Sequence, residues 1–451
     1  MTGMVLLRLL CVLVAAQTAF GLRLTMVSTA SRPAPLAQVV DRLRKAAQYV
    51  TEQPLRLQYS TTMAARVGYF LSQGLIISRL PGLAAEPAPS PTPAPAMAPL
   101  DVAAVIGAVA DAIVSDRPED IDFVIPSVSE KAYLGSEEQR ALFAKNFAAI
   151  IGLLRNDLRN IETGKYKMPF DLQPSLQNPQ FNPLSVASQA FNYATDRRNV
   201  LARSRRGPEG GLEIRQSFSS DRYPDYYLRN FHFQTDGWLS TQSAKIYDYQ
   251  VEALFLGTAD AMRRQLLPSM GEYFNQKGAA GAGVQHLDIA TGTGRFLSFV
   301  LDNWPSLEAT ALDLSPFYLA EAKSTLAPKH PSCKFVEAAA EQLPFPDASF
   351  DSISCVYMFH ELPRDIRQRV VSEMARVLRP GGKVFFCDSA QEGEVPTDRV
   401  LEGFTILAHE PFYLDYTKQS LRDLFGASGL VQDEGSEEVC WVSKVVTFTK
   451  A

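Results

Sequence analysis

The chain has few cysteines for its length, five among 451 residues. They show neither metal-site spacing nor a paired pattern, so we expect no disulfide framework, which suits a reducing or enzyme-regulated compartment. No cluster of cysteine and histidine, and no Ser–His–Asp order, stands out either. We therefore expect no bound metal and no hydrolase mechanism. The five cysteines are Cys11, Cys333, Cys355, Cys387 and Cys440, of which Cys355 and Cys387 fall in predicted strands as buried thiols.

Excess positive charge is also absent. The formal net charge is −5, which argues against a general nucleic-acid-binding surface. Arginine is concentrated in one block, Arg197–Arg206, which holds five of them. We interpret this block as a solvated surface, with contact to an acidic partner or a membrane face as the alternative.

The apolar run near the N-terminus is short. Leu9–Ala16 has signal-peptide length and is too short to span a membrane comfortably. The stretch after it is richer in arginine than in acidic residues and carries serine and threonine, as transit peptides do. A signal followed by such a segment, with Phe20 at the junction, resembles the bipartite presequence of algae with secondary plastids. We therefore expect a plastid protein; secretion, the ER lumen or a basic amphipathic helix at a membrane surface are the alternatives.

Composition divides the chain into four parts. Residues 1–80 are expected to be a presequence. The sequence leaves its cleavage site open, and partial retention of the helical-looking stretch 36–80 in the mature protein is the alternative. Residues 81–100 are a Pro/Ala linker, which should be extended and poorly packed. Residues 101–239 are expected to form a mainly helical region and lid, with helical spacing best developed over Ser136–Ile161 and a further helix near 185–203. Residues 240–451 form the last domain.

That domain is organised around Val284–Phe296, which reads VQHLDIATGTGRF. An apolar run ends at Asp288, a loop of small residues follows, and a helical-looking run comes next. A strand, tight loop and helix of this kind bring backbone N–H groups close to a bound ligand. The next predicted strand, Leu307–Leu314, carries Asp313, and an acidic residue roughly 20 to 25 positions past such a loop can accept hydrogen bonds from a ribose.

Two further blocks follow in order. Leu343–Asp351 reads LPFPDASFD and leads into a predicted strand over Ser352–Phe359. After a predicted helix, Leu378–Phe386 reads LRPGGKVFF, a turn followed by another strand. The chain closes with a helix near 419–427 and two apolar stretches around Val439–Phe448.

With LDIATGTG and Asp313, these blocks carry a resemblance to class I S-adenosylmethionine-dependent methyltransferases, in the group that includes the ubiquinone and menaquinone methyltransferases. The resemblance covers about Ser240–Lys450. It implies an α/β fold, a doubly wound, Rossmann-like sheet of seven mostly parallel strands with the last one antiparallel. Here that fold would follow an N-terminal mainly helical extension. It also implies S-adenosylmethionine as cofactor.

The resemblance also implies roles for particular residues. Two positions depart from the family pattern: Ala290 replaces a loop glycine, which is tolerable if its φ is negative, and Ala339 replaces a frequent aspartate that contacts adenine. Glu341 or a backbone carbonyl is then left to make that contact. The implied cofactor-binding residues are Tyr247 of the lid, Asp288, Ala290, Thr291, Gly292 and Gly294 at the methionine end, Asp313 and Leu314 at the ribose, and Ala339, Ala340 and Glu341 at the adenine.

The acceptor side is expected at the carboxyl ends of the strands and under an aromatic lid over 225–267. Most lid aromatics would only pack; Tyr247 and Gln234 are the ones expected to contact ligands. The fourth strand ends in Tyr357, His360 and Glu361. His360 is the candidate general base, because its unperturbed pKa lies near working pH, and a loop hydrogen bond is its alternative role. The predicted substrate-binding residues are Gln234, Tyr357, Asp388, His409 and Tyr413, and the predicted catalytic residues are His360 and Glu361.

These features predict a methyltransferase for a small apolar or aromatic metabolite in the plastid, such as a prenylquinone, a pigment or another lipid-like acceptor. The quinone C-methyltransferases commonly have an Arg–Asn pair where this chain has His360–Glu361, so a quinone substrate is not assured. A non-catalytic methyltransferase-like scaffold is the alternative. A nicotinamide-dependent oxidoreductase is disfavoured because LPFPDASFD and LRPGG have no role in it. We expect no nucleic-acid partner; peripheral membrane contact, the oligomeric state and the methylated atom stay open.

Overall fold

The computed structural model describes most of the chain from residue 53 onward. The leader before residue 53 and the Pro/Ala linker, both predicted above, lie outside the described part. Among the described helices, none combines the length and apolar character that crossing a membrane requires. The described residues are 53–79, 109–110, 112–114, 137–173, 182–218, 221–230, 232, 234–278, 281–395 and 410–451.

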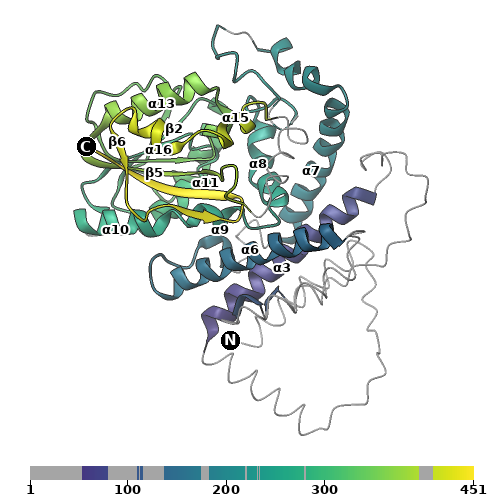
Figure 1. Ribbon diagram of the computed structural model, residues 1–451. Coiled ribbons are helices and arrows are strands. Elements are labelled where there is room, and N and C mark those ends of the chain that lie inside the picture. Colours follow the sequence, from purple (N-terminus) through teal and green to yellow (C-terminus); the bar gives the residue numbers. More distant parts are fainter. Residues whose placement is uncertain are drawn as a thin grey trace.

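A twisted sheet forms the centre of the C-terminal domain (Figure 1). The strand order is β3-β2-β1-β4-β5-β8-β6; β1 to β5 pair in parallel, and β8 is antiparallel to its partners. This confirms the predicted doubly wound fold with an antiparallel final strand, and adds an eighth strand, β7, that pairs with β8. The strands are β1 Gln285–Ile289, β2 Glu308–Asp313, β3 Lys334–Glu337, β4 Phe350–Val356, β5 Leu378–Ser389, β6 Leu430–Gln432, β7 Glu438–Cys440 and β8 Ser443–Lys450.

Both faces of the sheet are buried, as a parallel sheet requires. Side chains alternate along β5, so Phe385 joins the core on one face and Phe386 the core on the other. Helices α10 (Leu267–Lys277) and α11 (Arg295–Asn303) cover the first face, and α13 (Arg364–Val377) and α16 (Leu421–Gly426) cover the second. Helix α12 (Pro316–Leu326) connects β2 to β3. The four cysteines in the described residues are free and buried, and of these Cys355 and Cys387 were predicted as buried thiols.

The predicted helices appear close to their expected bounds. Helix α6 is Glu137–Glu162, α7 is Pro183–Ser204 and α8 is Thr241–Leu254, with Ser240 as the N-cap of α8. The fourth strand differs from the prediction. It ends at Val356 rather than Phe359, because Tyr357 has a φ of 56°, a left-handed conformation that cannot continue an extended strand.

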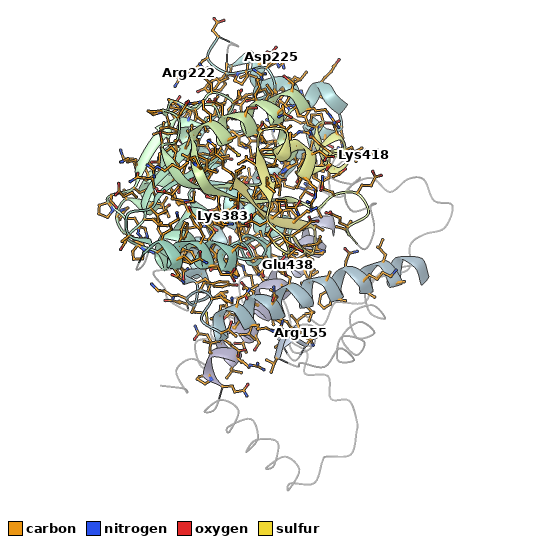
Figure 2. The ribbon with its side chains drawn as sticks, turned by 60° about the vertical axis from the view of Figure 1, so that its left-hand side comes forward. Arg155, Arg222, Asp225, Lys383, Lys418 and Glu438 are labelled. Carbon is orange, nitrogen blue, oxygen red and sulfur yellow. The ribbon has the colours of Figure 1, made fainter. Side chains whose placement is uncertain are left out.

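The helical extension packs against the sheet domain. Glu438 of β7 lies where these two parts meet (Figure 2), and the Asn156 amide donates to Glu438 Oε1 at 2.9 Å. Helix α9 (Ala259–Arg264) follows α8 and contacts both α6 and α11. The lid helix α8 is therefore supported from two sides.

Helix α3 (Pro54–Arg79) belongs to this packed body, although the sequence assigned residues up to 80 to a presequence. It contacts α6 and α8. Tyr59, Met63 and Val67 are fully buried, and Arg66 pairs with Asp171 at 2.8 Å. A leader removed as far as residue 80 would take this buried surface away, so the packing favours a boundary before Pro54.

Two truncations test that boundary. We expect a protein beginning at Gln53 to unfold like the full chain, and one beginning at Asp101 to lose about 2–3 kcal/mol of unfolding free energy. The loss is modest because ordering the helix offsets much of the gain from burying its apolar side chains. Urea unfolding would measure the difference in unfolding free energy. Equal unfolding midpoints for the proteins beginning at Gln53 and at Asp101 would mean that α3 does not stabilise the folded body and belongs to the leader.

Candidate functional site

The loop after β1 presents its backbone to open space. Ala290, Gly292 and Gly294 have φ values of 56°, 56° and 76°. A Cβ on Gly292 would meet nothing within 4 Å, so the backbone there is accessible to a ligand. A Cβ on Gly294 would lie 2.8 Å from Leu326 of α12, so that glycine is required by packing between helices.

From the sequence, Ala290 is tolerable if its φ is negative, and in the structure this residue does not meet that condition. Its φ is positive, so alanine carries the strain that the family's glycine would avoid. The strained residue lines the pocket described below. It is therefore placed where backbone geometry shapes a binding site.

Replacing this residue by glycine should stabilise the protein. We expect Ala290→Gly to raise the unfolding free energy by about 0.5–1 kcal/mol, because relief of the left-handed strain exceeds the entropy that glycine loses on folding. Ala427 has a φ of −58° and serves as the matched control, since its replacement by glycine should only destabilise. Thermal unfolding of both variants measures the contrast, and a loss of stability in Ala290→Gly would contradict it.

Two carboxylates lie at the ends of the neighbouring strands β1 and β2. Asp313 Oδ2 accepts from Gly292 N and Oδ1 from Ser315 N, each at 2.8 Å. Asp288 Oδ1 accepts from Ser354 Oγ at 2.5 Å, while its buried Oδ2 has no hydrogen-bond partner among the described residues. Burial raises the pKa of both carboxyls to about 6.

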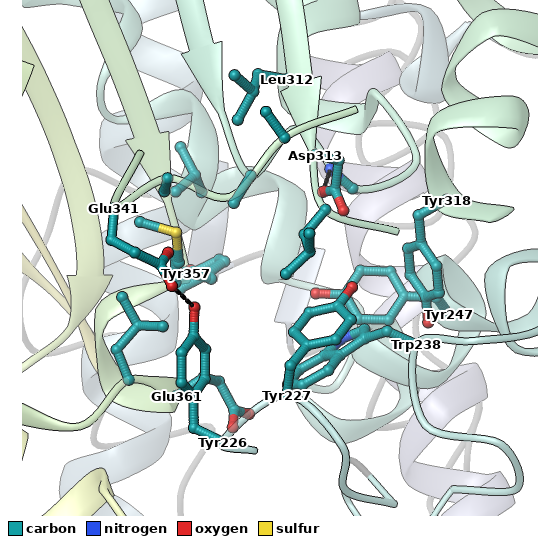
Figure 3. A pocket seen from close by; sticks show the side chains of 18 residues that line it. Tyr226, Tyr227, Trp238, Tyr247, Leu312, Asp313, Tyr318, Glu341, Tyr357 and Glu361 are labelled. Carbon is teal, nitrogen blue, oxygen red and sulfur yellow. Dashed lines mark hydrogen bonds between the residues drawn. The ribbon is translucent and has the colours of Figure 1, made fainter. Parts of the chain in front are cut away.

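A first pocket of about 780 Å³ opens beside Asp313 (Figure 3). On one side of it the rings of Tyr227 and Trp238 stack, with their centroids 4.9 Å apart. On the other side the Tyr226 hydroxyl donates a hydrogen bond to Glu341 Oε1 at 2.6 Å. Tyr226, Tyr227, Trp238 and Tyr318 line this pocket beyond the set named from the sequence. Of the predicted residues, Tyr247, Ala290, Gly292, Asp313, Leu314, Ala340, Glu341, Tyr357 and Glu361 line it.

Four predicted cofactor residues do not line that pocket. Asp288 and Thr291 are buried beneath the loop, Gly294 faces α12, and Ala339 is half-buried beside the lining residues Ala338 and Ala340. The aromatic wall comes from residues 226–247, which lie before the β1 loop in sequence. The structure thus brings the lid onto the carboxyl ends of the strands, as expected for the lid.

A second pocket of about 600 Å³ adjoins the first. The two share Trp238, Tyr247, Tyr357 and Glu361 as lining residues. The two pockets therefore lie next to each other along these four side chains. The second pocket is also lined by His232, His360, Ser389, Glu410 and Tyr413, with Val251, Leu254, Phe255, Val442 and Ser443.

His360 is held by Asp388, and its pKa differs from the sequence-based expectation. Its Nδ1 lies 2.5 Å from Asp388 Oδ1, and Asp388 Oδ2 accepts from Phe359 N at 2.7 Å. Burial acts to lower the pKa of His360, but Asp388 outweighs burial and raises it to about 10. The imidazole is then protonated at neutral pH, so the neutral base with a pKa near working pH, predicted above, is wrong for this arrangement.

Glu361 is the other predicted catalytic residue, and it lines both pockets. Burial, and then repulsion from Glu410, raises the pKa of Glu361 to about 7. Its position between the pockets makes Glu361, rather than His360, the group placed to take a proton from a molecule in the second pocket.

The predicted substrate residues are divided by the structure. Tyr357 and Tyr413 line the second pocket, and the Tyr413 hydroxyl hydrogen-bonds with Ser389 Oγ. Gln234 is fully buried, lines neither pocket, and donates to Ser243 O at 3.3 Å, so its selection as a ligand contact is wrong for these pockets. Asp388 is also fully buried and acts on His360 instead of facing a pocket. His409 lies outside the described residues.

The sequence missed the pairing of His232 with Glu410, which hydrogen-bond to each other beside the second pocket. His232 lies in the predicted aromatic lid, and Glu410 follows directly after the predicted substrate residue His409. No spacing rule connects two residues so far apart in the chain.

Comparison with known proteins places the chain among methyltransferases. A family model described as a methyltransferase domain matches residues 287–382, from β1 to the Pro-Gly-Gly turn. A ubiquinone/menaquinone biosynthesis C-methyltransferase from Brucella canis is 30% identical over 218 residues, covering 46% of this chain and 74% of that protein. A demethylmenaquinone methyltransferase from Deinococcus radiodurans is 40% identical over 98 residues, covering 22% of this chain and 40% of that protein.

Solved structures are similar in part. A magnesium protoporphyrin IX methyltransferase from Synechocystis is 13% identical, with a TM-score of 0.34, and the match covers 44% of this chain and 87% of that one. A sarcosine dimethylglycine methyltransferase from Galdieria sulphuraria is 16% identical, with a TM-score of 0.33, and the match covers 45% and 88%.

Proposed function

Because this chain belongs to the class I S-adenosylmethionine-dependent methyltransferases, we propose that it methylates a small apolar or aromatic metabolite held in the second pocket. The observation that carries the proposal is the adjoining pair of pockets that share Trp238, Tyr247, Tyr357 and Glu361. One pocket would hold the cofactor and the other the acceptor, with the reacting groups meeting between them.

The residues of the first pocket fit S-adenosylmethionine. Asp313 keeps lone pairs free for ribose hydroxyls beyond its two backbone bonds. The open backbone at Gly292 suits the charged methionine end. Asp288 lies buried beneath that loop and does not line the pocket. Glu341 and the small side chain of Ala340 would flank the adenine.

When bound, S-adenosylmethionine supplies a methyl group on a positively charged sulfur, and the leaving group is neutral. The chain's task is then to orient the acceptor and to exclude water. Trp238, Tyr247 and Tyr357 give both pockets aromatic surface where the two adjoin. Glu361 is the group that could accept a proton from the acceptor, and Asp388 fixes the neighbouring His360 in place.

The nature of the acceptor is inferred from the wall of the second pocket. Phe255, Tyr357 and Tyr413 give it aromatic surface, and Ser389 and Glu410 give it polar groups. A ring carrying hydroxyl or carbonyl groups fits this combination. A prenylquinone precursor, pigment or other lipid-like compound has that chemistry, and the relatives named as demethylmenaquinone methyltransferases support the first of these.

We further propose a plastid location, supported by the signal-like run and the arginine-rich stretch after it, with secretion or the ER lumen as the alternative. Helix α3 packs against the folded body, and this packing favours cleavage before Pro54. A fluorescent protein fused after residue 80 would report the compartment directly.

The proposed function is tested by metabolite comparison. In extracts of a knockout and its parent, we expect one compound to accumulate and its partner, heavier by one methylene, to disappear. Purified protein beginning at Gln53 should transfer label from S-adenosylmethionine to the accumulated compound. Cofactor binding without transfer to any fraction of the extract would favour the scaffold reading instead.

A further inference from the structure

Three side chains from distant parts of the sequence meet at the wall of the second pocket. His232 comes from the loop before α8, Glu361 from the 3₁₀ turn after β4, and Glu410 from the segment before α15 (Tyr413–Thr417). One potential ligand atom of each lies within 4.8 Å of the other two. His232 Nε2 is 4.0 Å from Glu361 Oε1 and hydrogen-bonds with Glu410 Oε1.

The two carboxylates of this cluster are incompletely satisfied. Glu361 Oε1 and Glu410 Oε2 are buried and accept no hydrogen bond from the part of the chain that the structure describes. The Glu410 side chain is only 3% exposed and the Glu361 side chain 11%. A buried acceptor without a partner is costly, and two carboxylates this close repel each other. A positive ligand between them would remove both penalties.

We propose that His232, Glu361 and Glu410 bind one divalent cation of the Mn²⁺ to Zn²⁺ type. Imidazole together with carboxylate is a donor set that these cations accept. Three protein ligands leave coordination positions open, and all three residues line the second pocket, so the open positions face the acceptor. Small side-chain rotations would bring the three atoms to the roughly 2.0–2.2 Å that such bonds require.

This inference rests on the proposed function and restricts the chemical class of its methyl acceptor. Open positions on a cation select an acceptor with two adjacent oxygens, as in a catechol or a hydroxyl beside a carbonyl. A bound cation also lowers the pKa of a coordinated hydroxyl, so it would do the work assigned above to Glu361 as a base. No metal site was predicted from the sequence, because the three ligands are far apart in the chain and share no local spacing.

Metal binding can be measured without turnover. The full chain, freed of metal by a chelator, is titrated with Mn²⁺ and followed by electron paramagnetic resonance, and separately loaded with Zn²⁺ and analysed for metal content. We expect one cation per chain. Glu410→Gln and His232→Asn should each weaken binding by about 100-fold or more, since even outer-shell partners contribute 10–100-fold. Asparagine is chosen because His232 has a φ of 46°, which asparagine tolerates.

Glu341→Gln is the matched control, because it removes a carboxylate from the first pocket and should leave cation affinity unchanged. Titrating Glu410→Gln with S-adenosylmethionine separates this proposal from the function it rests on: cofactor binding should be retained while the cation is lost. The site is refuted if the unmodified chain binds no stoichiometric cation. It is also refuted if Glu410→Gln and His232→Asn both bind the cation as tightly as the unmodified chain does. If Glu410→Gln fails to fold, His232→Asn decides alone.

Discussion

Asp313→Ala should weaken S-adenosylmethionine binding by about 3 kcal/mol, or roughly 150-fold. Asp313 is the last residue of β2 and lines the first pocket. The free lone pairs of its carboxylate are available to ribose hydroxyls. A hydrogen bond to a charged acceptor is worth about 1.5–3 kcal/mol, and alanine removes the two bonds that Asp313 is expected to accept from the ribose hydroxyls. Isothermal titration of protein beginning at Gln53 measures the loss directly.

The same carboxylate also organises the loop, so binding and folding must be separated. Asp313 accepts from the backbone of Gly292 and of Ser315, and alanine leaves both N–H groups without this partner. Asp313→Asn keeps the shape and one acceptor oxygen, and it should fall between the parent and alanine in affinity. Asp347→Ala removes an exposed carboxylate and should change nothing. Unchanged affinity in Asp313→Ala, with the thermal midpoint recorded for each variant, would remove the assignment of this pocket to the cofactor.

Local patterns were enough to predict the central part of this fold. The strand, loop and helix around Asp288, and the next strand with Asp313, each depend on a few consecutive residues whose periodicity is visible in the sequence. The N-cap at Ser240 is equally local. Such features were therefore predicted with bounds that the structure matches closely. The turn predicted over residues 379–382 is instead part of β5, which already begins at Leu378.

Features that depend on distant contacts were not predictable in the same way. The φ of Ala290 is set by the fold around the loop, and nothing in the residue type indicates it. Gln234 is polar and stands among lid aromatics, yet its environment is a buried turn rather than a pocket. Helix α3 was placed with the leader because its composition resembles one, whereas its partners lie far away in the chain.

The pKa of His360 is a similar case. A histidine at the end of a strand suggests a base, but its protonation is set by Asp388 on the neighbouring strand β5. Glu361 gains its role from the geometry of two pockets, which a sequence does not display. Sequence reasoning therefore placed His360 and Glu361 at the edge of the sheet where the two pockets lie, and it could not assign their protonation states.

Asp260→Asn should destabilise the protein by about 3–5 kcal/mol, the largest stability effect that we expect from a single substitution. Asp260 is almost fully buried in α9 and accepts from three guanidinium groups: Arg295 Nη2 at 2.5 Å, Arg263 Nη1 at 2.8 Å and Arg66 Nη2 at 3.3 Å. Asparagine would remove the ion-pair partner that Asp260 gives to Arg263 and Arg295, whereas Arg66 would keep Asp171 at 2.8 Å and Glu252 at 3.0 Å. Urea unfolding at pH 7 provides the measurement.

The effect should depend on pH in a direction that identifies its cause. Burial acts to raise the pKa of Asp260, but Arg295, Arg263 and Arg66 outweigh burial and hold it well below its usual value. A carboxyl with a depressed pKa adds stability that is complete above its unfolded pKa of about 3.9 and is lost as pH falls toward the folded value. The part of the gap between parent and Asp260→Asn that comes from this carboxyl should therefore shrink as pH falls below about 4.

The position of this cluster gives Asp260→Asn a second expected consequence. Arg295 is the first residue of α11, directly after Gly294, so the guanidinium that Asp260 holds sits at the end of the ligand-facing loop. Loss of its partner should loosen the loop and weaken cofactor binding along with stability. Asp365→Asn breaks an exposed pair with Arg369 and, as the matched control, should cost at most about 0.5 kcal/mol and leave binding intact. If both variants unfold at the same urea concentration, the buried charges are not what holds α9 against the loop.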